Sequence, residues 1–176
     1  MNRDAMSMSL RVGHGFDLHR LKRGGRLMLC GIVAAEDMSA VAHSDGDVAI
    51  HALVDAILGA LGRDDIGRMF PDTDVRWKGA SSSIFLERAL CEVRRAGMRV
   101  VNADLTILAR RPRIDPLRAR MRDAIESLVG APVNIKAGTN EGCDAVGRGA
   151  AIAAHAVVLL AKASGTRRRP AHTNRR

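Results

Sequence analysis

Aromatic side chains are scarce in this chain, which has three phenylalanines, one tryptophan and no tyrosine among 176 residues. Proteins that hold single-stranded nucleic acid usually stack the bases on aromatic rings, so this composition argues against that class. Because 47% of the residues are hydrophobic, a sizeable core is expected, built from aliphatic side chains and methionine. A chain of this length is expected to form one domain.

Cysteine is also sparse. Cys30, Cys91 and Cys143 lie far apart, are odd in number and form no Cys-x-x-Cys motif. They are therefore not a disulfide framework, and no secretory segment is recognisable before them. We expect a reducing, cytoplasmic compartment.

Long hydrophobic runs are absent. The longest, AAIAAHAVVLLA at residues 150–161, is too short to cross a bilayer and is interrupted by His155. It predicts a buried helix over residues 147–163, and no membrane association is expected.

Acidic residues are outnumbered, and the formal net charge is +9. Much of the excess lies at the C-terminal end, in Arg167, Arg168, Arg169, Arg175 and Arg176. A basic end rich in Pro, Thr and Asn is typical of a solvated segment. We therefore expect a flexible N-terminus at residues 1–9, a domain at 10–163 and a disordered basic tail at 164–176. Nucleic acid is an unlikely partner on this distribution of charge.

Periodicity predicts an α+β fold, a single domain in which helices cover one side of a mixed four-stranded sheet. Alternating or apolar runs predict strands at residues 10–19, 27–33, 99–110 and 132–140. Helical spacing predicts helices at residues 47–61, 83–95, 116–130 and 147–163. The first helix is expected to take Ser44 or Asp45 as its N-cap. Residues 63–82 are rich in Gly, Pro, Asp and Ser and predict a long functional loop.

Three side chains form a candidate metal site. Asp17 and His19 alternate on one predicted strand and so share a face, and His51 lies on the first predicted helix. A single histidine on a helix is more often a satisfied core or surface residue, but the joint spacing favours ligands. Two imidazoles and one carboxylate suit Zn²⁺ and leave a coordination position open, as catalytic zinc requires.

Five motifs occur in order over residues 11–162: GHGFDLH, AHSDGDVAIHALVDAILGAL, DIGRMFPDTD, RRPRI and TNEGCDAVGRG. With them the sequence resembles the 2-C-methyl-D-erythritol 2,4-cyclodiphosphate synthase family of the non-mevalonate isoprenoid pathway. A composite pattern of this length seldom arises by chance.

The resemblance implies a phosphorus–oxygen lyase. Its substrate is 4-diphosphocytidyl-2-C-methyl-D-erythritol 2-phosphate, whose 2-phosphate attacks the β-phosphorus to close a cyclic diphosphate and release CMP. It also implies a homotrimer with active sites between subunits, Zn²⁺ or another divalent ion on Asp17, His19 and His51, and Mg²⁺ or Mn²⁺ on the substrate diphosphate, held by Glu141.

The resemblance further assigns roles to single residues. The implied catalytic residues are His43, Asp65 and Thr139. Phosphate contacts are implied for Ser44 and Thr139, and erythritol contacts for Asp65, Phe70 and Asp72. Asp55 either contacts substrate or supports a ligand imidazole. The implied cytidine pocket consists of Ala109, Pro112, Arg113 and Ile114. Asn140 is a further expected substrate contact, and Arg148 matches a residue at the trimer axis.

Departures from the family pattern concern one segment. Gly138 replaces a threonine, Ala145 an aromatic residue and Ala150 a glutamate, so the cavity at the implied trimer axis is expected to be lined differently here. Two other functions remain as alternatives: a zinc-dependent phosphohydrolase that activates water at the open zinc position, and a non-enzymatic basic binding module.

Overall fold

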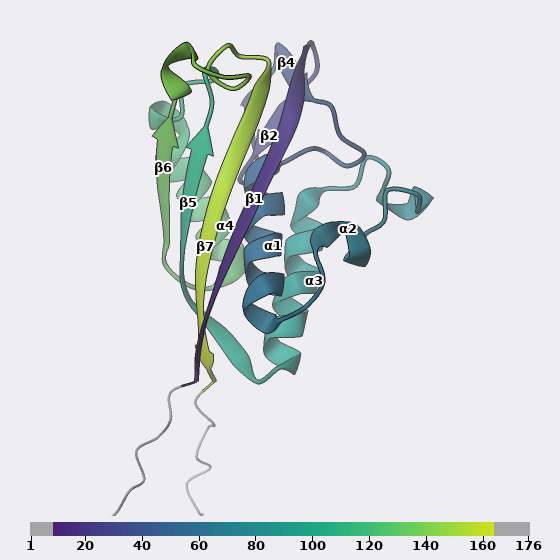
Figure 1. The fold of residues 1–176 in the computed structure, drawn as a ribbon, viewed down its shortest axis with the longest axis vertical. Coiled ribbons are helices and arrows are strands. Elements are labelled where there is room, and N and C mark those ends of the chain that lie inside the picture. The colour runs from purple at the N-terminus through teal and green to yellow at the C-terminus, as the bar shows by residue number, and fades with distance from the viewer. Residues whose placement is uncertain (1–8, 164–176) are drawn as a thin grey trace, which may run out of the picture.

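The computed structural model describes residues 9–163 (Figure 1). Except for Ser9, the predicted flexible N-terminus and the predicted basic tail lie outside the described residues. The strands are β1 (Leu10–Arg23), β2 (Leu27–Leu29), β3 (Ile32–Ala35), β4 (Met38–Ala40), β5 (Met98–Leu108), β6 (Val133–Gly138) and β7 (Ala151–Lys162). The helices are α1 (Val48–Leu61), α2 (Ile66–Met69), α3 (Ser82–Arg95) and α4 (Arg118–Val129), with short 3-10 turns at Val75–Trp77, Asp115–Leu117 and Asn140–Gly142.

The main sheet has the strand order β4-β1-β7-β5-β6. Strands β5 and β6 run parallel and the other neighbours run antiparallel, so the sheet is mixed as predicted. It has five strands rather than the four predicted. In Figure 1 helices α1, α3 and α4 all lie behind the sheet, which confirms an α+β domain with helices on one side. None of the described helices is long and apolar enough to cross a membrane.

Strand β7 accounts for the main error of the sequence prediction. Residues 147–163 were predicted as a helix, but residues 151–162 form β7, which lies between β1 and β5. Residues 151–162 are a nearly continuous apolar run, and periodicity alone does not separate such a strand from a buried helix. The alanines favour a helix on local propensity, and the packing of α1 over β7 overrides that preference.

Smaller differences surround the first helix. The predicted strand at 27–33 is a hairpin, β2 and β3, that turns at Cys30 and Gly31, both with positive φ. The N-cap of α1 is Asp47, and not Ser44 or Asp45 as predicted, because Asp47 Oδ1 accepts a hydrogen bond from the backbone N–H of Ile50. Asp47 Oδ1 also accepts from the backbone N–H of Cys30, and Oδ2 accepts from that of Gly31. This buried carboxylate joins α1 to the hairpin. The predicted loop at 63–82 contains α2 and a 3-10 turn, and β4 was not predicted.

Two glycines let α1 lie unusually close to β1. A Cβ atom built on Gly13 falls 1.8 Å from the carbonyl oxygen of Ala56, and one built on Gly15 falls 1.9 Å from that of Ala52. Only glycine permits this approach, and the alanines opposite are small as well. The short separation brings the first turns of α1 within reach of the side chains on β1.

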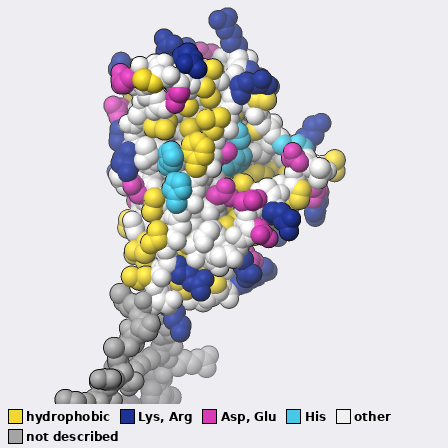
Figure 2. All heavy atoms as spheres, viewed as in Figure 1, with side chains coloured by type: hydrophobic (Ala, Val, Ile, Leu, Met, Phe, Trp, Pro, Cys, Tyr) yellow, Lys and Arg dark blue, Asp and Glu magenta, His cyan; other side chains and the backbone are white. Residues whose placement is uncertain are grey.

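Within residues 9–163, no helix packs on the other face of the sheet. Leu10, Val12, Phe16 and Leu18 on β1 and Val157 on β7 are exposed large hydrophobic residues. Figure 2 shows hydrophobic side chains over this face with histidines among them. On β1 and β7, the rings of His14 and His155 meet with 3.2 Å between Nε2 of His14 and Nδ1 of His155. The alternating apolar residues of the strand predicted at 10–19 therefore mark this open face and not the core.

Candidate metal centre and neighbouring pockets

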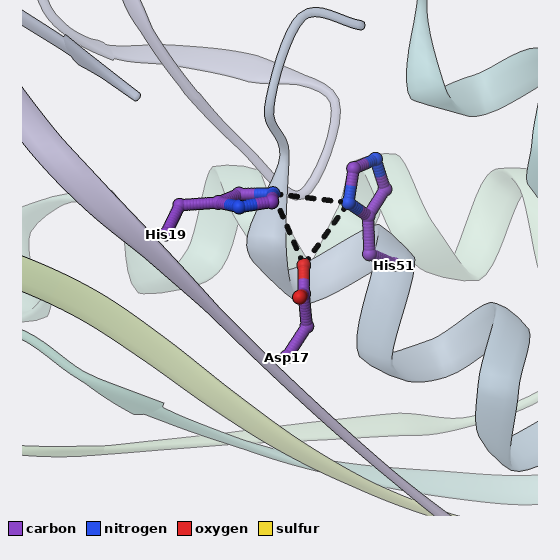
Figure 3. Close-up of side chains that lie close together, drawn as sticks. All are labelled: Asp17, His19 and His51. Carbon is purple, nitrogen blue, oxygen red and sulfur yellow. Dashed lines mark hydrogen bonds and ion pairs between the residues drawn. The ribbon is translucent and has the colours of Figure 1, made fainter. Parts of the chain in front are cut away.

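Asp17, His19 and His51 meet as predicted (Figure 3). The Oδ2 atom of Asp17 lies 3.1 Å from Nε2 of His19 and 3.0 Å from Nδ1 of His51, and those two nitrogens are 3.1 Å apart. Asp17 Oδ1 accepts a hydrogen bond from the backbone N–H of Leu18, which leaves Oδ2 for the triad. The three donor atoms form a nearly equilateral triangle.

The size of this triangle fits a divalent ion. A tetrahedral zinc site with bonds of about 2.0–2.1 Å separates its ligand atoms by roughly 3.3 Å. The observed separations of 3.0–3.1 Å are slightly shorter. Three lone-pair atoms that converge in this way need a cation or shared protons between them. The residues present therefore fit a metal ion that is coordinated by three protein ligands.

Burial and charge act together on the ionisation of the triad. Burial alone would raise the pKa of Asp17, but the close contact with the His51 ring and the charges of the two histidines hold that pKa below its usual value. Burial lowers the pKa of His19, and Asp17 opposes this effect only in part. A neutral imidazole beside a carboxylate is the protonation state that metal ligands need.

Further hydrogen bonds hold the far side of the His51 ring. Its Nε2 atom lies 2.9 Å from the hydroxyl oxygen of Ser82 and 3.2 Å from that of Ser44. Ser82 is fully buried at the start of α3 and hydrogen bonds to the carboxylate of Asp45. Sequence reasoning missed Ser82, because a serine at the start of a helix normally indicates only a cap.

A pocket of about 240 Å³ opens beside the triad. Among the predicted site residues, its lining includes His19, His43, Ser44, His51, Phe70 and Asp72. Trp77 and Phe85 also line it and were not predicted. Their ring centroids lie 5.3 Å and 4.5 Å from that of Phe70, and 5.8 Å from each other. The buried Nε2 of His43 and Nε1 of Trp77 have no hydrogen-bond partner within the described part of the chain. This pocket joins a metal site to polar groups available for a ligand.

Two predicted carboxylates shape the wall of the pocket. Asp65 caps α2, since its Oδ1 accepts a hydrogen bond from the backbone N–H of Arg68. Asp55 Oδ1 accepts from the backbone N–H of Ile66 at 2.8 Å, which fastens α2 to α1. Burial raises the pKa of Asp55, although that hydrogen bond opposes the rise. In the structure Asp55 therefore holds the segment that begins α2 and hydrogen bonds to neither ligand imidazole.

The remaining predicted residues lie elsewhere. A separate pocket of about 440 Å³ is lined by Ala109, Pro112, Arg113, Ile114 and Thr139 among others, and shares no lining residue with the first. The Thr139 hydroxyl donates to Glu141 at 2.8 Å, and the Asn140 amide donates to Asp144 at 2.8 Å. Glu141 is not part of the metal-binding group.

Arg148 lines a third pocket. With Lys22, Arg23, Arg110 and Arg111 it lines a basic pocket of about 600 Å³ near the ends of β1 and β5. Ala145 packs on Val146, Ala151 and Ala153 in a small cluster apart from the main core, and its carbonyl accepts from the N–H of Ala150.

Comparisons with known proteins place this chain in one family. Residues 10–161 match the model of the YgbB family. The chain therefore belongs to the YgbB family, and the resemblance predicted from its motifs is confirmed.

Similar proteins are named 2-C-methyl-D-erythritol 2,4-cyclodiphosphate synthase. The chain is 48% identical over 159 residues to the chloroplastic 2-C-methyl-D-erythritol 2,4-cyclodiphosphate synthase of Arabidopsis thaliana, covering 89% of this chain and 69% of that protein. It is 46% identical over 154 residues to the synthase of the same name from Nitrosococcus oceani, covering 86% of this chain and 98% of that protein. It spans about two thirds of the plant relatives' length.

Solved structures give the same result. A 2C-methyl-D-erythritol-2,4-cyclodiphosphate synthase with CDP bound superposes with a TM-score of 0.79 at 41% identity, covering 85% of this chain and 99% of that one. The bifunctional IspDF from Campylobacter jejuni superposes with a TM-score of 0.85 at 36% identity, covering 89% of this chain but only 43% of that one.

Proposed function

We propose that this chain is a lyase that converts 4-diphosphocytidyl-2-C-methyl-D-erythritol 2-phosphate into 2-C-methyl-D-erythritol 2,4-cyclodiphosphate and CMP, in the non-mevalonate pathway. This is the activity for which its relatives are named. The observation that carries the proposal is the donor triangle of Asp17, His19 and His51 at the mouth of a pocket. In the reaction an oxygen of the 2-phosphate bonds to the β-phosphorus, and the bond from that phosphorus to the CMP oxygen breaks. No water is consumed.

Asp17, His19 and His51 would hold Zn²⁺ or another divalent ion. Such an ion supplies charge neutralisation for two phosphates that must approach each other. The protein's own part is positioning: an in-line attack requires the two phosphates to be held close together and aligned. We assign the phosphate contacts to His43 and Ser44, which line the pocket next to the triad. The ring nitrogen Nε2 of His43 has no hydrogen-bond partner among residues 9–163 and is available for a phosphate.

The pocket wall would bind the erythritol part. Asp72 and Phe70 line the pocket, and Asp65 caps the adjoining helix α2. Carboxylate oxygens are good acceptors for the hydroxyl groups of a diol. Asp55 keeps this wall in place through its bond to the N–H of Ile66.

We propose further that the working site is shared between subunits of a homotrimer. The predicted cytidine pocket at Ala109, Pro112, Arg113 and Ile114 and the predicted phosphate contact Thr139 surround a pocket separate from that beside the triad. A neighbouring copy of the chain could supply the missing half. The open face of the sheet, with its exposed apolar side chains, favours such an assembly. In it Glu141 would hold Mg²⁺ or Mn²⁺ on the diphosphate, Asn140 would contact the substrate and Arg148 would lie toward the axis.

Cellular location and chain organisation belong to the same proposal. Cys30, Cys91 and Cys143 are all free thiols, as a reducing cytoplasm allows. The family match over residues 10–161 supports a domain over the predicted range 10–163.

The test uses the purified zinc-loaded protein and the CDP-linked substrate in water enriched in ¹⁸O. We expect equal amounts of CMP and cyclic diphosphate, with no ¹⁸O in either. Asp17→Asn and His51→Ala should remove both turnover and bound zinc. Product that carries ¹⁸O would instead support a phosphohydrolase, and full turnover in a zinc-free variant would refute the proposal.

A further inference from the structure

The Nε2 atom of His51, on the side of the ring away from the triad, lies closest to the hydroxyl of Ser82, which in turn hydrogen bonds to Asp45. We propose that Ser82, supported by Asp45, is a positioning residue that fixes the His51 imidazole with its Nδ1 lone pair directed at the metal. The inference deepens the proposed function and rests on metal binding by the triad.

Hydrogen-bond chemistry assigns the protons. A serine hydroxyl has one hydrogen to donate and can accept through its lone pairs. Ser82 Oγ makes a very close hydrogen bond to Asp45 Oδ1, and an ionised carboxylate only accepts, so the hydrogen of Ser82 points to Asp45. Ser82 Oγ must then accept the hydrogen of His51 Nε2, which lies 2.9 Å away.

This assignment determines the protonation of the other ring nitrogen, Nδ1 of His51. With the hydrogen on Nε2, a neutral His51 has a bare Nδ1, which lies 3.0 Å from Asp17 Oδ2 and 3.1 Å from His19 Nε2. The partner of the second nitrogen therefore selects the tautomer that can bind a metal. Ligand histidines generally have such a partner, and it also fixes the plane of the ring.

Asp45 is itself held firmly. Its Oδ2 atom accepts from the backbone N–H of Ser82 at 3.0 Å, and its Oδ1 atom accepts from the backbone N–H of Asp47 at 3.3 Å. These bonds tie the start of α3 to the segment before α1. Ser82 is 0% exposed, so water does not compete for its hydroxyl. The orientation of the His51 ring is thereby fixed by α3 as well as by α1, the helix that carries His51.

Ser44 is the other hydroxyl near Nε2, but it is the weaker candidate. It lies 3.2 Å from Nε2, accepts from the N–H of Gly46 at 3.2 Å and lines the pocket. No carboxylate in the described hydrogen-bond network takes its hydrogen. Because Ser82 holds the imidazole, the Ser44 hydroxyl is free to donate to a phosphate in the pocket.

The test compares Ser82→Ala with Ser81→Ala as the matched control. Ser81 is the exposed neighbour, and its side chain contacts only Ser83 among the described hydrogen bonds. Ser82→Ala removes the hydroxyl but keeps the backbone bond to Asp45. We expect its zinc dissociation constant, measured by chelator competition, to rise about 10- to 100-fold. Ser81→Ala should match the parent, and Ser82→Thr, which keeps a hydroxyl, should recover most of the affinity.

A spectroscopic measurement separates positioning from stability. In the zinc-loaded parent labelled with ¹⁵N, the His51 Nε2–H should appear as a slowly exchanging proton, and in Ser82→Ala it should exchange with solvent. Absence of this proton from the parent spectrum refutes the inference even if the alanine variant does not fold. Zinc affinity unchanged in a folded Ser82→Ala, or lost equally in a folded Ser82→Thr, refutes it as well. A parent that binds no zinc refutes the proposed metal function together with this inference.

Discussion

Gly15 provides a test of how the fold positions the metal site. In Gly15→Ala the new Cβ atom would lie 1.9 Å from the carbonyl oxygen of Ala52, whereas real Cβ atoms essentially never approach closer than 3.0 Å. The obstacle is helix backbone, which no side-chain rotation relieves. Helix α1 must therefore retreat from β1 by at least about 1 Å, because close-packed interiors have no spare room.

Two effects follow from that retreat. Overpacking usually costs about 1–3 kcal/mol, and the backbone clash places this variant at the upper end, which corresponds to a melting temperature lower by roughly 6–12 °C. His51 moves with α1 while Asp17 and His19 stay on β1, so the donor triangle opens. A misplacement of about 1 Å lowers turnover by roughly 100-fold. Thermal unfolding of the metal-free protein and steady-state kinetics measure the two effects separately.

Gly59 supplies the matched control on the same helix. A Cβ atom there has only the carbonyl oxygen of His14 nearby, at 3.9 Å, which is ordinary contact. Gly59→Ala should therefore stabilise the protein by up to about 1 kcal/mol through helix propensity and leave zinc binding unchanged. The reasoning is refuted if Gly15→Ala unfolds at the parent's temperature and retains parent zinc affinity.

Two further perturbations test other parts of the account. Asp47→Ala should lower the free energy of unfolding in urea by about 2–5 kcal/mol, since it removes the N-cap of α1 and leaves buried N–H groups of the β2–β3 turn unpaired; a loss below about 1 kcal/mol would contradict this role. Burial alone would raise the pKa of Asp104, but hydrogen bonds from Lys136 and Asn134 hold it below its usual value. The stability from Asp104 is therefore present above its unfolded pKa of about 3.9 and is lost as the pH falls through the lower folded value. Asp104→Asn should flatten this acid-side loss by less than about 1 kcal/mol, because the pair is partly exposed; an unchanged pH profile of urea unfolding would contradict it.

The sequence predicted the metal triad because two short-range patterns determine it. Residues two apart on a strand share a face, which places Asp17 with His19, and the helical spacing of the segment that follows places His51 on α1. The glycines within the strand at residues 10–19 also indicate a close approach of other backbone, and Gly13 and Gly15 do lie against the backbone of α1.

Other features of the fold and site could not be predicted from the sequence because they depend on tertiary packing. Residues 151–162 have alanines enough for a helix, and only their place between β1 and β5 decides for a strand. Ser82 is far from His51 in sequence, and no local pattern connects them. Thr139 and Glu141 lie away from the triad's pocket in a single chain, so their predicted roles require a neighbouring copy.

Calorimetric titration of zinc into the metal-free protein tests the central claim most directly. The account predicts one tight site per chain in the parent and its loss in His51→Ala and in Asp17→Asn, with both variants still folded by circular dichroism. An isotherm that is the same in the parent and in either variant would contradict it, because the ion would then bind somewhere other than at these three side chains.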